Sequence, residues 1–259
     1  GTLTTNQRTL QKIFLGNRMV EVTGVGFKPE GSFEVEGIEI DAEKDETLKT
    51  FLQIAALCND SGIEVQDAEE GGRWQVQGDP TEGALIVASA KAGLHKEELE
   101  QTFPRIDEIA FNPNNRYMAT FHRNQNGDVQ VYLKGAPETV LAMCTGFVED
   151  GVVKNLGQKE KQELLEKSSE MAAGALRVLA MASRTLEFDE IERFKKEGPS
   201  DLIFAGFSGM MDPPRPEAID AVKLCKRAGI KVFMATGDHK ITAEAIAREM
   251  GILGGASKV

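Results

Sequence analysis

Thr236, Gly237 and Asp238 form a short segment whose residue types and position suit the binding of an anion. The segment follows an apolar strand pattern and precedes a helical one, which is where open α/β sheets bind ligands and where helix N–H groups attract negative charge. Asp212 and Arg215 follow an earlier strand pattern in the same way, so we expect them to face the same crevice. Each segment also fits an ordinary helix start, with an aspartate as cap or a proline beside a surface charge pair. The convergence of two strand ends favours a functional site.

Lys134 and Gly135 end a strand pattern over residues 129–134, in which three apolar side chains alternate with polar ones. Alternation places Lys134 on the face opposite the apolar side chains, where its ammonium group could reach a phosphate or a polarised ring. Gly135 permits close backbone approach, and Pro137 begins a helix whose amide end favours an anion. The simpler interpretation is a solvated lysine on an edge strand.

Phe111, Arg116 and Arg177 are further candidates for ligand contacts. Phe111 ends an apolar strand pattern before a polar turn, and such a residue is more often part of the core than a stacking platform. Arginines are usually salt-bridged or solvated, but Arg177 lies within the apolar segment 175–182, which favours a specific anionic partner.

Two different patterns of elements position these residues. Up to about residue 200, runs with period two and runs with helical spacing indicate an α+β arrangement, in which helices flank an antiparallel sheet. The expected elements are a hairpin over residues 18–40, helices over 45–58, 80–92, 137–143, 159–173 and 190–196, strands over 74–77, 106–111, 117–123, 129–134 and 176–181, and a loop over 59–72. From about residue 202, a strand, a helix to 227, a strand over 230–235 and a helix over 241–250 predict a parallel sheet and a second structural unit.

Composition excludes several classes of protein. The 259 residues carry 41 acidic and 30 basic side chains, a net charge of −11, which argues against nucleic acid as a partner. The longest mostly apolar stretch, residues 202–211, is far shorter than the ~20 residues of a membrane-spanning helix. The three cysteines lie far apart without paired spacing, so we expect buried thiols rather than a disulfide framework or a zinc site.

Six motifs, in order along the chain, resemble the cytosolic catalytic region of the P-type cation-transporting ATPases, most closely the calcium-pump branch. They cover almost the whole chain: Gly-Thr-Leu-Thr-Thr-Asn at 1–6, Leu-Cys-Asn-Asp at 57–60, Asp-Pro-Thr-Glu at 79–82, Lys-Gly-Ala-Pro-Glu at 134–138, Asp-Pro-Pro-Arg at 212–215 and Ala-Thr-Gly-Asp at 235–238. The first matches the end of the family's phosphorylation motif Asp-Lys-Thr-Gly-Thr-Leu-Thr.

The resemblance implies an α+β nucleotide-binding domain, residues 8–207, inserted into a partial α/β domain of the haloacid-dehalogenase type, residues 1–7 and 208–259. It implies ATP and Mg²⁺ as cofactors, with the transmembrane and actuator domains of a pump as partners. The chain would be a cytoplasmic piece of an integral membrane protein, itself without a membrane span. The transported cation stays open: calcium is favoured by resemblance alone, and magnesium, sodium, potassium and protons remain alternatives.

By matched position, the resemblance also implies roles for single residues. Phe111 would stack on adenine, Glu82 would hydrogen-bond around the base, and Lys134 with Gly135 would line the base pocket. Arg177 would approach the polyphosphate, and Arg116 stands where the calcium-pump branch has lysine. Thr236, Gly237 and Asp238 would meet the γ-phosphate and Mg²⁺ when the domains close, with Asp212 and Arg215 supporting that crevice.

The family's nucleophilic aspartate would stand three residues before Gly1, and its Gly-Asp-Gly-Val-Asn-Asp segment, which supplies Mg²⁺ carboxylates, is not in the sequence. We therefore expect no metal site within the chain, and a piece of the pump that binds nucleotide without turning it over. Two alternatives remain: a soluble phosphatase of the dehalogenase type, which needs an Asp-x-Asp nucleophile after its first strand, and a non-catalytic nucleotide-sensing module.

Overall fold

The computed structural model describes residues 3–5, 7–66, 73–149, 151–236 and 240–253. The strands are β1 Thr9–Leu15, β2 Arg18–Val22, β3 Phe33–Val35, β4 Ile38–Ile40, β5 Gly62–Gln66, β6 Arg73–Gln77, β7 Arg105–Asn112, β8 Tyr117–Arg123, β9 Val129–Gly135, β10 Cys144–Glu149, β11 Val152–Asn155, β12 Arg177–Leu186 and β13 Leu202–Met211. The helices are α1 Glu46–Leu57, α2 Pro80–Lys91, α3 Lys96–Thr102, α4 Pro137–Met143, α5 Gln158–Ala173, α6 Ile191–Glu197, α7 Pro216–Arg227 and α8 Lys240–Glu249, with a 3-10 turn, η2, at Phe188–Glu190.

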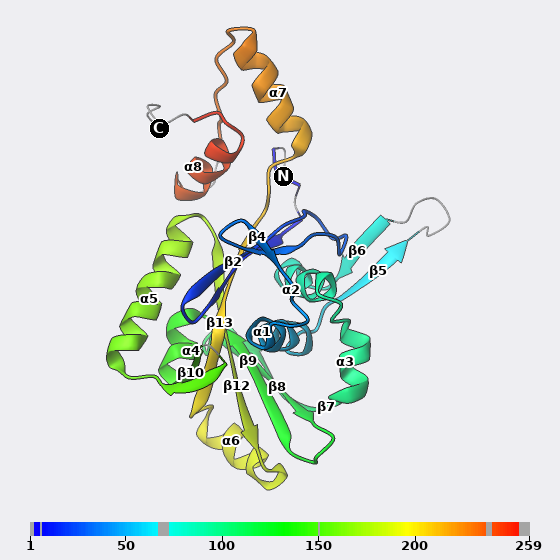
Figure 1. The fold of residues 1–259 in the computed structure, drawn as a ribbon, viewed down its shortest axis with the longest axis vertical. Helices are drawn as coiled ribbons and strands as arrows, with labels where there is room; N and C mark the ends of the chain where they lie inside the picture. The colour runs from blue at the N-terminus through cyan, green and yellow to red at the C-terminus, as the bar shows by residue number, and fades with distance from the viewer. Residues whose placement is uncertain (1–2, 6, 67–72, 150, 237–239, 254–259) are drawn as a thin grey trace.

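One large sheet organises most of the chain. Its strands follow the order β4-β3-β2-β1-β13-β12-β9-β8-β7, all neighbours along this path being antiparallel, while β10 joins β13 in parallel and carries β11. The hairpin β5–β6 projects separately (Figure 1). The prediction of an α+β fold with an antiparallel sheet and flanking helices is confirmed.

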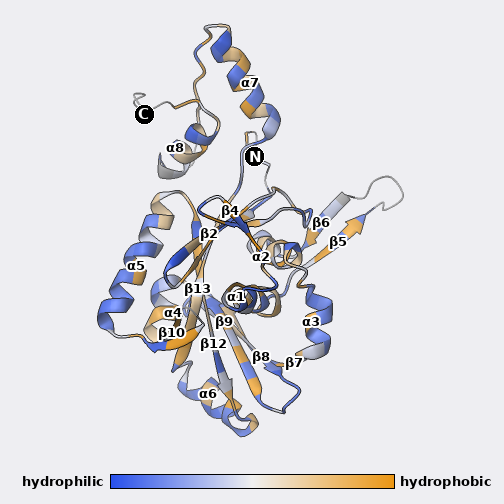
Figure 2. Ribbon diagram, in the orientation of Figure 1, coloured by the Kyte–Doolittle hydropathy of each residue, from blue (hydrophilic) through white to orange (hydrophobic). Residues whose placement is uncertain are grey.

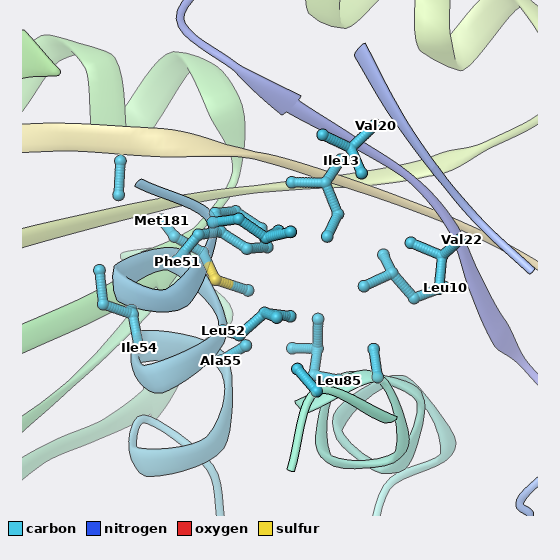
Figure 3. Close-up of a cluster of buried hydrophobic side chains, with 14 of the residues drawn as sticks. Leu10, Ile13, Val20, Val22, Phe51, Leu52, Ile54, Ala55, Leu85 and Met181 are labelled. Carbon is cyan, nitrogen blue, oxygen red and sulfur yellow. The ribbon is translucent and has the colours of Figure 1, made fainter. Parts of the chain in front are cut away.

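Helices cover both faces of the sheet and create two cores. On one face, α1 and α2 bury residues such as Phe51 and Leu85 against Leu10, Ile13 and Met181 of the strands (Figure 3). On the other face, the apolar residues of β8, β9, β12 and β13 meet α4, α5 and α6. Because both faces are covered, the central strand β13 is apolar nearly throughout, whereas β8, β9 and β12 mix apolar and polar residues, as the mixed colours of Figure 2 show.

Aspartates begin the two helices of the first face. The side chain of Asp45 accepts a hydrogen bond from the backbone N–H of Leu48, and Asp79 accepts from those of Thr81 and Glu82. These bonds satisfy amides that have no partner within the helix and so fix where α1 and α2 start.

The register of the sheet aligns the ends of several strands that carry candidate residues. Asn112 of β7 lies opposite Tyr117 of β8, Tyr117 opposite Gly135 of β9, and Gly135 opposite Ala180 of β12. This row of four paired residues defines the "upper row" of the sheet. Candidate residues from different strands therefore meet at one end of the sheet, next to the start of α2.

The predicted strand over residues 230–235 is wrong. β13 extends to Met211 and pairs antiparallel with β1 and β12, and residues 230–236 form no strand. A strand requires a hydrogen-bonding neighbour, and no described strand pairs with 230–235. The apolar pattern of β13 arises instead from burial between two helix layers.

Other elements differ from expectation mainly where patterns are short. β1, α3, β10 and β11 were not predicted, and β5 lies in the expected loop 59–72. Within that loop, residues 67–72 lie outside the described part. The predicted helices 241–250 and 216–227 correspond to α8 and α7, which sit with the N-terminal segment beyond one end of the sheet (Figure 1).

Two of the three cysteines are buried, as expected, and one is not. Cys58 and Cys144 are buried free thiols, but Cys225 is only half-buried, so the expectation of burial is wrong for this one. Among the described residues, no helix combines the length and apolar character needed to cross a bilayer.

Candidate functional site

Lys134 and Glu82 form an ion pair beside the upper row. Lys134 is on β9, between β8 and β12, and only 7% of its surface is exposed. Its Nζ lies 2.6 Å from Oε1 of Glu82 and also donates to the carbonyl oxygen of Cys58, the C-cap of α1. The predicted side-chain direction is confirmed, and the alternative of a solvated edge lysine is wrong.

The second carboxylate oxygen of Glu82 is held by the segment after α1. Oε2 accepts hydrogen bonds from the backbone N–H of Asp60 at 3.0 Å and from Oγ of Ser61 at 3.3 Å. Asn59, fully buried, donates from Nδ2 to the carbonyl oxygens of Ala55 and Glu82. The motif at 57–60 therefore locks α1 to the start of α2 and fixes the orientation of the Glu82 carboxylate. Sequence reasoning quoted this motif but assigned its residues no role.

Gly135 and Arg116 meet at the turn between β7 and β8. A Cβ atom on Gly135 would lie 2.5 Å from the carbonyl oxygen of Arg116, which accepts a hydrogen bond from the backbone N–H of Ala136 at 3.0 Å. Gly135 is therefore needed for strand contact within the protein itself. The guanidinium of Arg116 lies 2.6 Å from Oε1 of Glu138, and both side chains are more than half exposed. Arg116 is thus both salt-bridged and solvated, which agrees with the ordinary interpretation of an arginine and leaves its charge at the surface.

Phe111 is 62% exposed, next to the upper row. The pairing of β7 with β8 is irregular between Ile109 and Asn112, so the backbone at Phe111 departs from the regular ladder. The alternative of a core residue is wrong for Phe111. An exposed ring at a strand end can accept a flat ligand on its face.

Arg177 begins β12 and is exposed, and a second arginine, Arg8, lies near it at the same end of the sheet. Burial and, after it, the positive charge of Arg177 lower the pKa of Arg8. Burial opposes ionisation of Asp79, but hydrogen bonds from Thr81 and Glu82 and the charge of Arg177 together lower the pKa of its carboxyl group. Sequence reasoning missed Arg8, whose only signal was a basic residue directly before a strand.

Asp212 connects the chain after β13 to the N-terminal segment. Its carboxylate accepts hydrogen bonds from Oγ1 of Thr4 at 2.7 Å, from Oγ1 of Thr5 at 3.2 Å and from the backbone N–H of Gln7 at 3.1 Å. The backbone N–H of Arg215 donates to the carbonyl oxygen of Leu3 at 2.8 Å.

Thr236 is exposed, whereas the candidates Gly237 and Asp238 lie outside the described residues. The predicted crevice shared by residues 212–215 and 236–238 therefore stays a prediction.

The described residues fit a nucleotide better than a metal ion. An exposed aromatic ring, a fixed carboxylate and several cations are gathered at one end of the sheet, which suits a ligand with a flat base and an anionic tail. No group of three or more His, Cys, Asp or Glu side chains among the described residues could hold a metal ion, and the Asp212 carboxylate already accepts hydrogen bonds from Thr4, Thr5 and Gln7. These residues do not make a Mg²⁺ site by themselves.

Comparison with known proteins agrees with this geometry. The profile of the family described as "P-type ATPase, cytoplasmic domain N" matches residues 47–217. The chain is 43% identical to the cation-transporting ATPase pma1 of Synechocystis, over 97% of this chain and 28% of that protein. It is 36% identical to a calcium-transporting ATPase of Bacillus subtilis, over 100% of this chain and 28% of the relative. It is 37% identical to the probable cation-transporting ATPase F of Mycobacterium tuberculosis, over 98% of this chain and 27% of the relative. The chain thus spans between a quarter and a third of these relatives, and it belongs to the P-type ATPase family, with residues 47–217 matching the family's cytoplasmic domain N.

Proposed function

We propose that this chain binds ATP at the upper row of its sheet and serves as the nucleotide-binding part of a cation-transporting pump. The observation that carries the proposal is the ion pair of buried Lys134 with half-buried Glu82, at the same end of β7, β8 and β9 as the exposed ring of Phe111. Family membership supplies the class of ligand, and this arrangement supplies a place for it.

Different residues bind different parts of the nucleotide. Phe111 offers its ring face to the adenine base, because its side chain is exposed and stacking needs an accessible π face. Glu82 accepts hydrogen bonds from the base, and the ion pair with Lys134 holds its carboxylate in a fixed orientation. Arg177, exposed at the start of β12, contacts the phosphates, and Arg116, next to Gly135 at the upper row, adds positive charge to the site.

We further propose that the whole protein hydrolyses ATP through an aspartyl phosphate and couples this reaction to cation transport. The attacking carboxylate would be the aspartate of the family's phosphorylation motif, and Mg²⁺ would neutralise charge on the phosphates. Residues 212–215 and 236–238 would border that reaction in the closed pump, and transmembrane and actuator domains would be its partners. Three of the relatives carry calcium in their names, so calcium is the first cation to test in the whole protein.

The domain boundaries that we propose are residues 8–207 for the nucleotide-binding domain and residues 1–7 and 208–259 for part of a phosphorylation domain of the dehalogenase type. The antiparallel pairing of Thr9 with Met211 supports an insertion, because the chain then enters and leaves the sheet on neighbouring strands. Neither alternative from the sequence is favoured. The match to a pump domain argues against both a free-standing phosphatase and a separate sensing module.

Isothermal titration of the 259-residue chain with ATP and with a non-hydrolysable analogue tests the binding site. We expect Phe111→Ala, which removes the stacking ring, and Lys134→Ala, which removes the ion pair that orients Glu82, each to weaken binding about five- to a hundredfold, equivalent to about 1–3 kcal/mol. Phe188→Ala is the matched control, because Phe188 is also exposed (57%) but follows the opposite end of β12. Unchanged affinity in Phe111→Ala, with circular dichroism confirming the fold, would contradict the proposed site.

A further inference from the structure

Arg8 is a half-buried arginine for which neither the motifs nor the family match supplies a role. It stands directly before β1, and its Nη1 donates a hydrogen bond to Oγ1 of Thr81 at 2.7 Å. Thr81 is itself buried in the first turn of α2, next to Glu82. In the first turn of α2, Glu82 therefore contacts Lys134, and Thr81 contacts Arg8.

The register of the sheet places Arg8 and Arg177 on the same face. Leu10 of β1 lies opposite Met210 of β13, and Met210 lies opposite Arg177 of β12. Leu10 and Met210 belong to the core beneath α1 and α2, so Arg177 points to this face as well. Arg8, two residues before Leu10, reaches α2 on the same side. The two guanidinium groups thus lie on the same face of the sheet. Arg8 directly precedes β1, Arg177 begins β12, and β13 lies between these two strands.

The charges around the two arginines are not matched by direct ion pairs. Within the part of the chain that the structure describes, no ion pair shorter than 4 Å joins Arg8 or Arg177 to a carboxylate. Asp79 directs its carboxylate to the amides of Thr81 and Glu82, and Asp212 accepts three hydrogen bonds from the N-terminal segment. Asp79 and Asp212 act on Arg8 by charge through space, but neither forms an ion pair with it, and two neighbouring guanidinium groups without a direct carboxylate contact favour a doubly charged anion between them.

The distance from the proposed base site suits a phosphate chain. Met181 of β12 lies opposite Lys134, and Arg177 is four residues earlier on the same strand. At about 3.3 Å per residue, this separation is about 13 Å along the strand. A nucleotide whose base lies by Lys134 and Phe111 can therefore extend its phosphates toward Arg177.

We propose that Arg8 is a second phosphate-binding residue and that Arg8 and Arg177 together hold the polyphosphate of the bound nucleotide. This role rests on the proposed function and sharpens it. The arginine pair would set the preference for nucleoside di- and triphosphates over monophosphates and nucleosides, while Phe111 and Glu82 recognise the base.

Titration of the 259-residue chain with ATP, ADP, AMP and adenosine tests this role. We expect Arg8→Met to weaken ATP binding about tenfold or more and to leave adenosine and AMP binding unchanged, so that the ATP-to-AMP affinity ratio falls. Arg8→Lys keeps the charge without the planar fork and should retain part of the preference. Lys12→Gln is the matched control, because it removes one positive charge from the same strand while Lys12 pairs only with Glu21 at the surface.

The outcomes separate the two proposals. Failure of the wild-type chain to bind any of the four compounds overturns the proposed function and this role with it. Tight binding of ATP by the wild-type chain, together with an unchanged ATP-to-AMP ratio in Arg8→Met, overturns the role of Arg8 alone. A uniform loss for all four compounds also contradicts the role, since it indicates a structural effect of the Arg8–Thr81 hydrogen bond.

Discussion

The body of the molecule, residues 8–211, and the C-terminal arm, residues 212–253, differ sharply in what they bury. The body encloses two cores in which Phe51, Phe121 and Phe204 are almost completely hidden. The described part of the arm has a small cluster around Val222, Ile246 and Met250, whereas Phe233 is 86% exposed. In Figure 2 both regions contain helices with apolar stripes, but only the body supplies a sheet for them to cover. The comparison teaches that an amphipathic pattern predicts a helix, while its stability depends on a second layer.

The largest difference between the two regions should appear in the loss of stability when an aromatic ring is removed. We expect Phe51→Ala to lower the free energy of unfolding by about 3–5 kcal/mol, because the substitution leaves a cavity between α1 and the sheet. The residue is 0% exposed and belongs to the core beneath α1 and α2. Urea denaturation followed by circular dichroism measures the change.

Phe233→Ala is the matched substitution in the arm. Since the ring is 86% exposed, its removal should change the free energy of unfolding by less than about 0.5 kcal/mol. Equal losses for the two variants would show that the arm has a core comparable with that of the body.

A buried histidine should give the body a pH dependence. His122 of β8 is 0% exposed, and burial above all lowers its pKa from 6.5 to about 4. Its ring nitrogens lie 2.9 Å from the carbonyl oxygen of Phe103 and 2.9 Å from Oγ1 of Thr120. Below pH 6.5 the unfolded chain binds a proton that the folded chain does not, so folding stability falls as the pH falls from 6.5 toward 4. The loss amounts to about 3 kcal/mol when complete.

The pH dependence of urea denaturation tests this expectation. We expect His122→Gln to flatten the stability profile between pH 7 and pH 4 relative to the wild-type chain. His95→Asn, which removes an exposed histidine before α3, is the control and should leave the profile unchanged. An identical slope in wild type and His122→Gln would mean that the histidine does not resist protonation in the fold.

The sequence predicts the body well because local and long-range signals agree there. The helices predicted over 45–58 and 80–92, the meander β7–β8–β9 and the direction of Lys134 all follow from periodicity and turn residues. β1 escapes prediction because the strands that pair with it are β2 and β13, the latter about two hundred residues away. In the arm, the prediction of a strand is wrong for the opposite reason. Residues 230–235 have the composition of a strand, but within the described chain no strand lies beside them.

Some residues of the candidate site could likewise be predicted from the sequence, and others could not. Glu82, Lys134 and Gly135 belong to motifs whose local structure the sequence indicates, and the structure brings them together. Arg8 could not be predicted, because its neighbour Arg177 becomes adjacent only through the pairing of β1, β13 and β12. No spacing rule connects residues so far apart in the chain.

Loss of the Asp212 carboxylate should loosen the junction between body and arm without affecting the body. In Asp212→Ala, Thr4, Thr5 and Gln7 lose a shared acceptor, and each unsatisfied donor at a half-buried position costs about 1–3 kcal/mol unless water replaces it. The backbone N–H groups of Thr5 and Arg215, which bond across the junction to Pro213 and Leu3, should exchange with solvent about ten to a hundred times faster.

Hydrogen exchange followed by NMR or mass spectrometry resolves this local effect from global unfolding. Amides of β12 should keep their protection in Asp212→Ala, because they pair with β9 and β13 inside the body. Asp220→Ala, which breaks only an exposed ion pair with Lys223 on α7, should leave the junction amides unchanged. If β12 lost protection to the same extent as Thr5 and Arg215, the junction and the body would open as one unit, and the division between a well-buried body and a separately anchored arm would not hold.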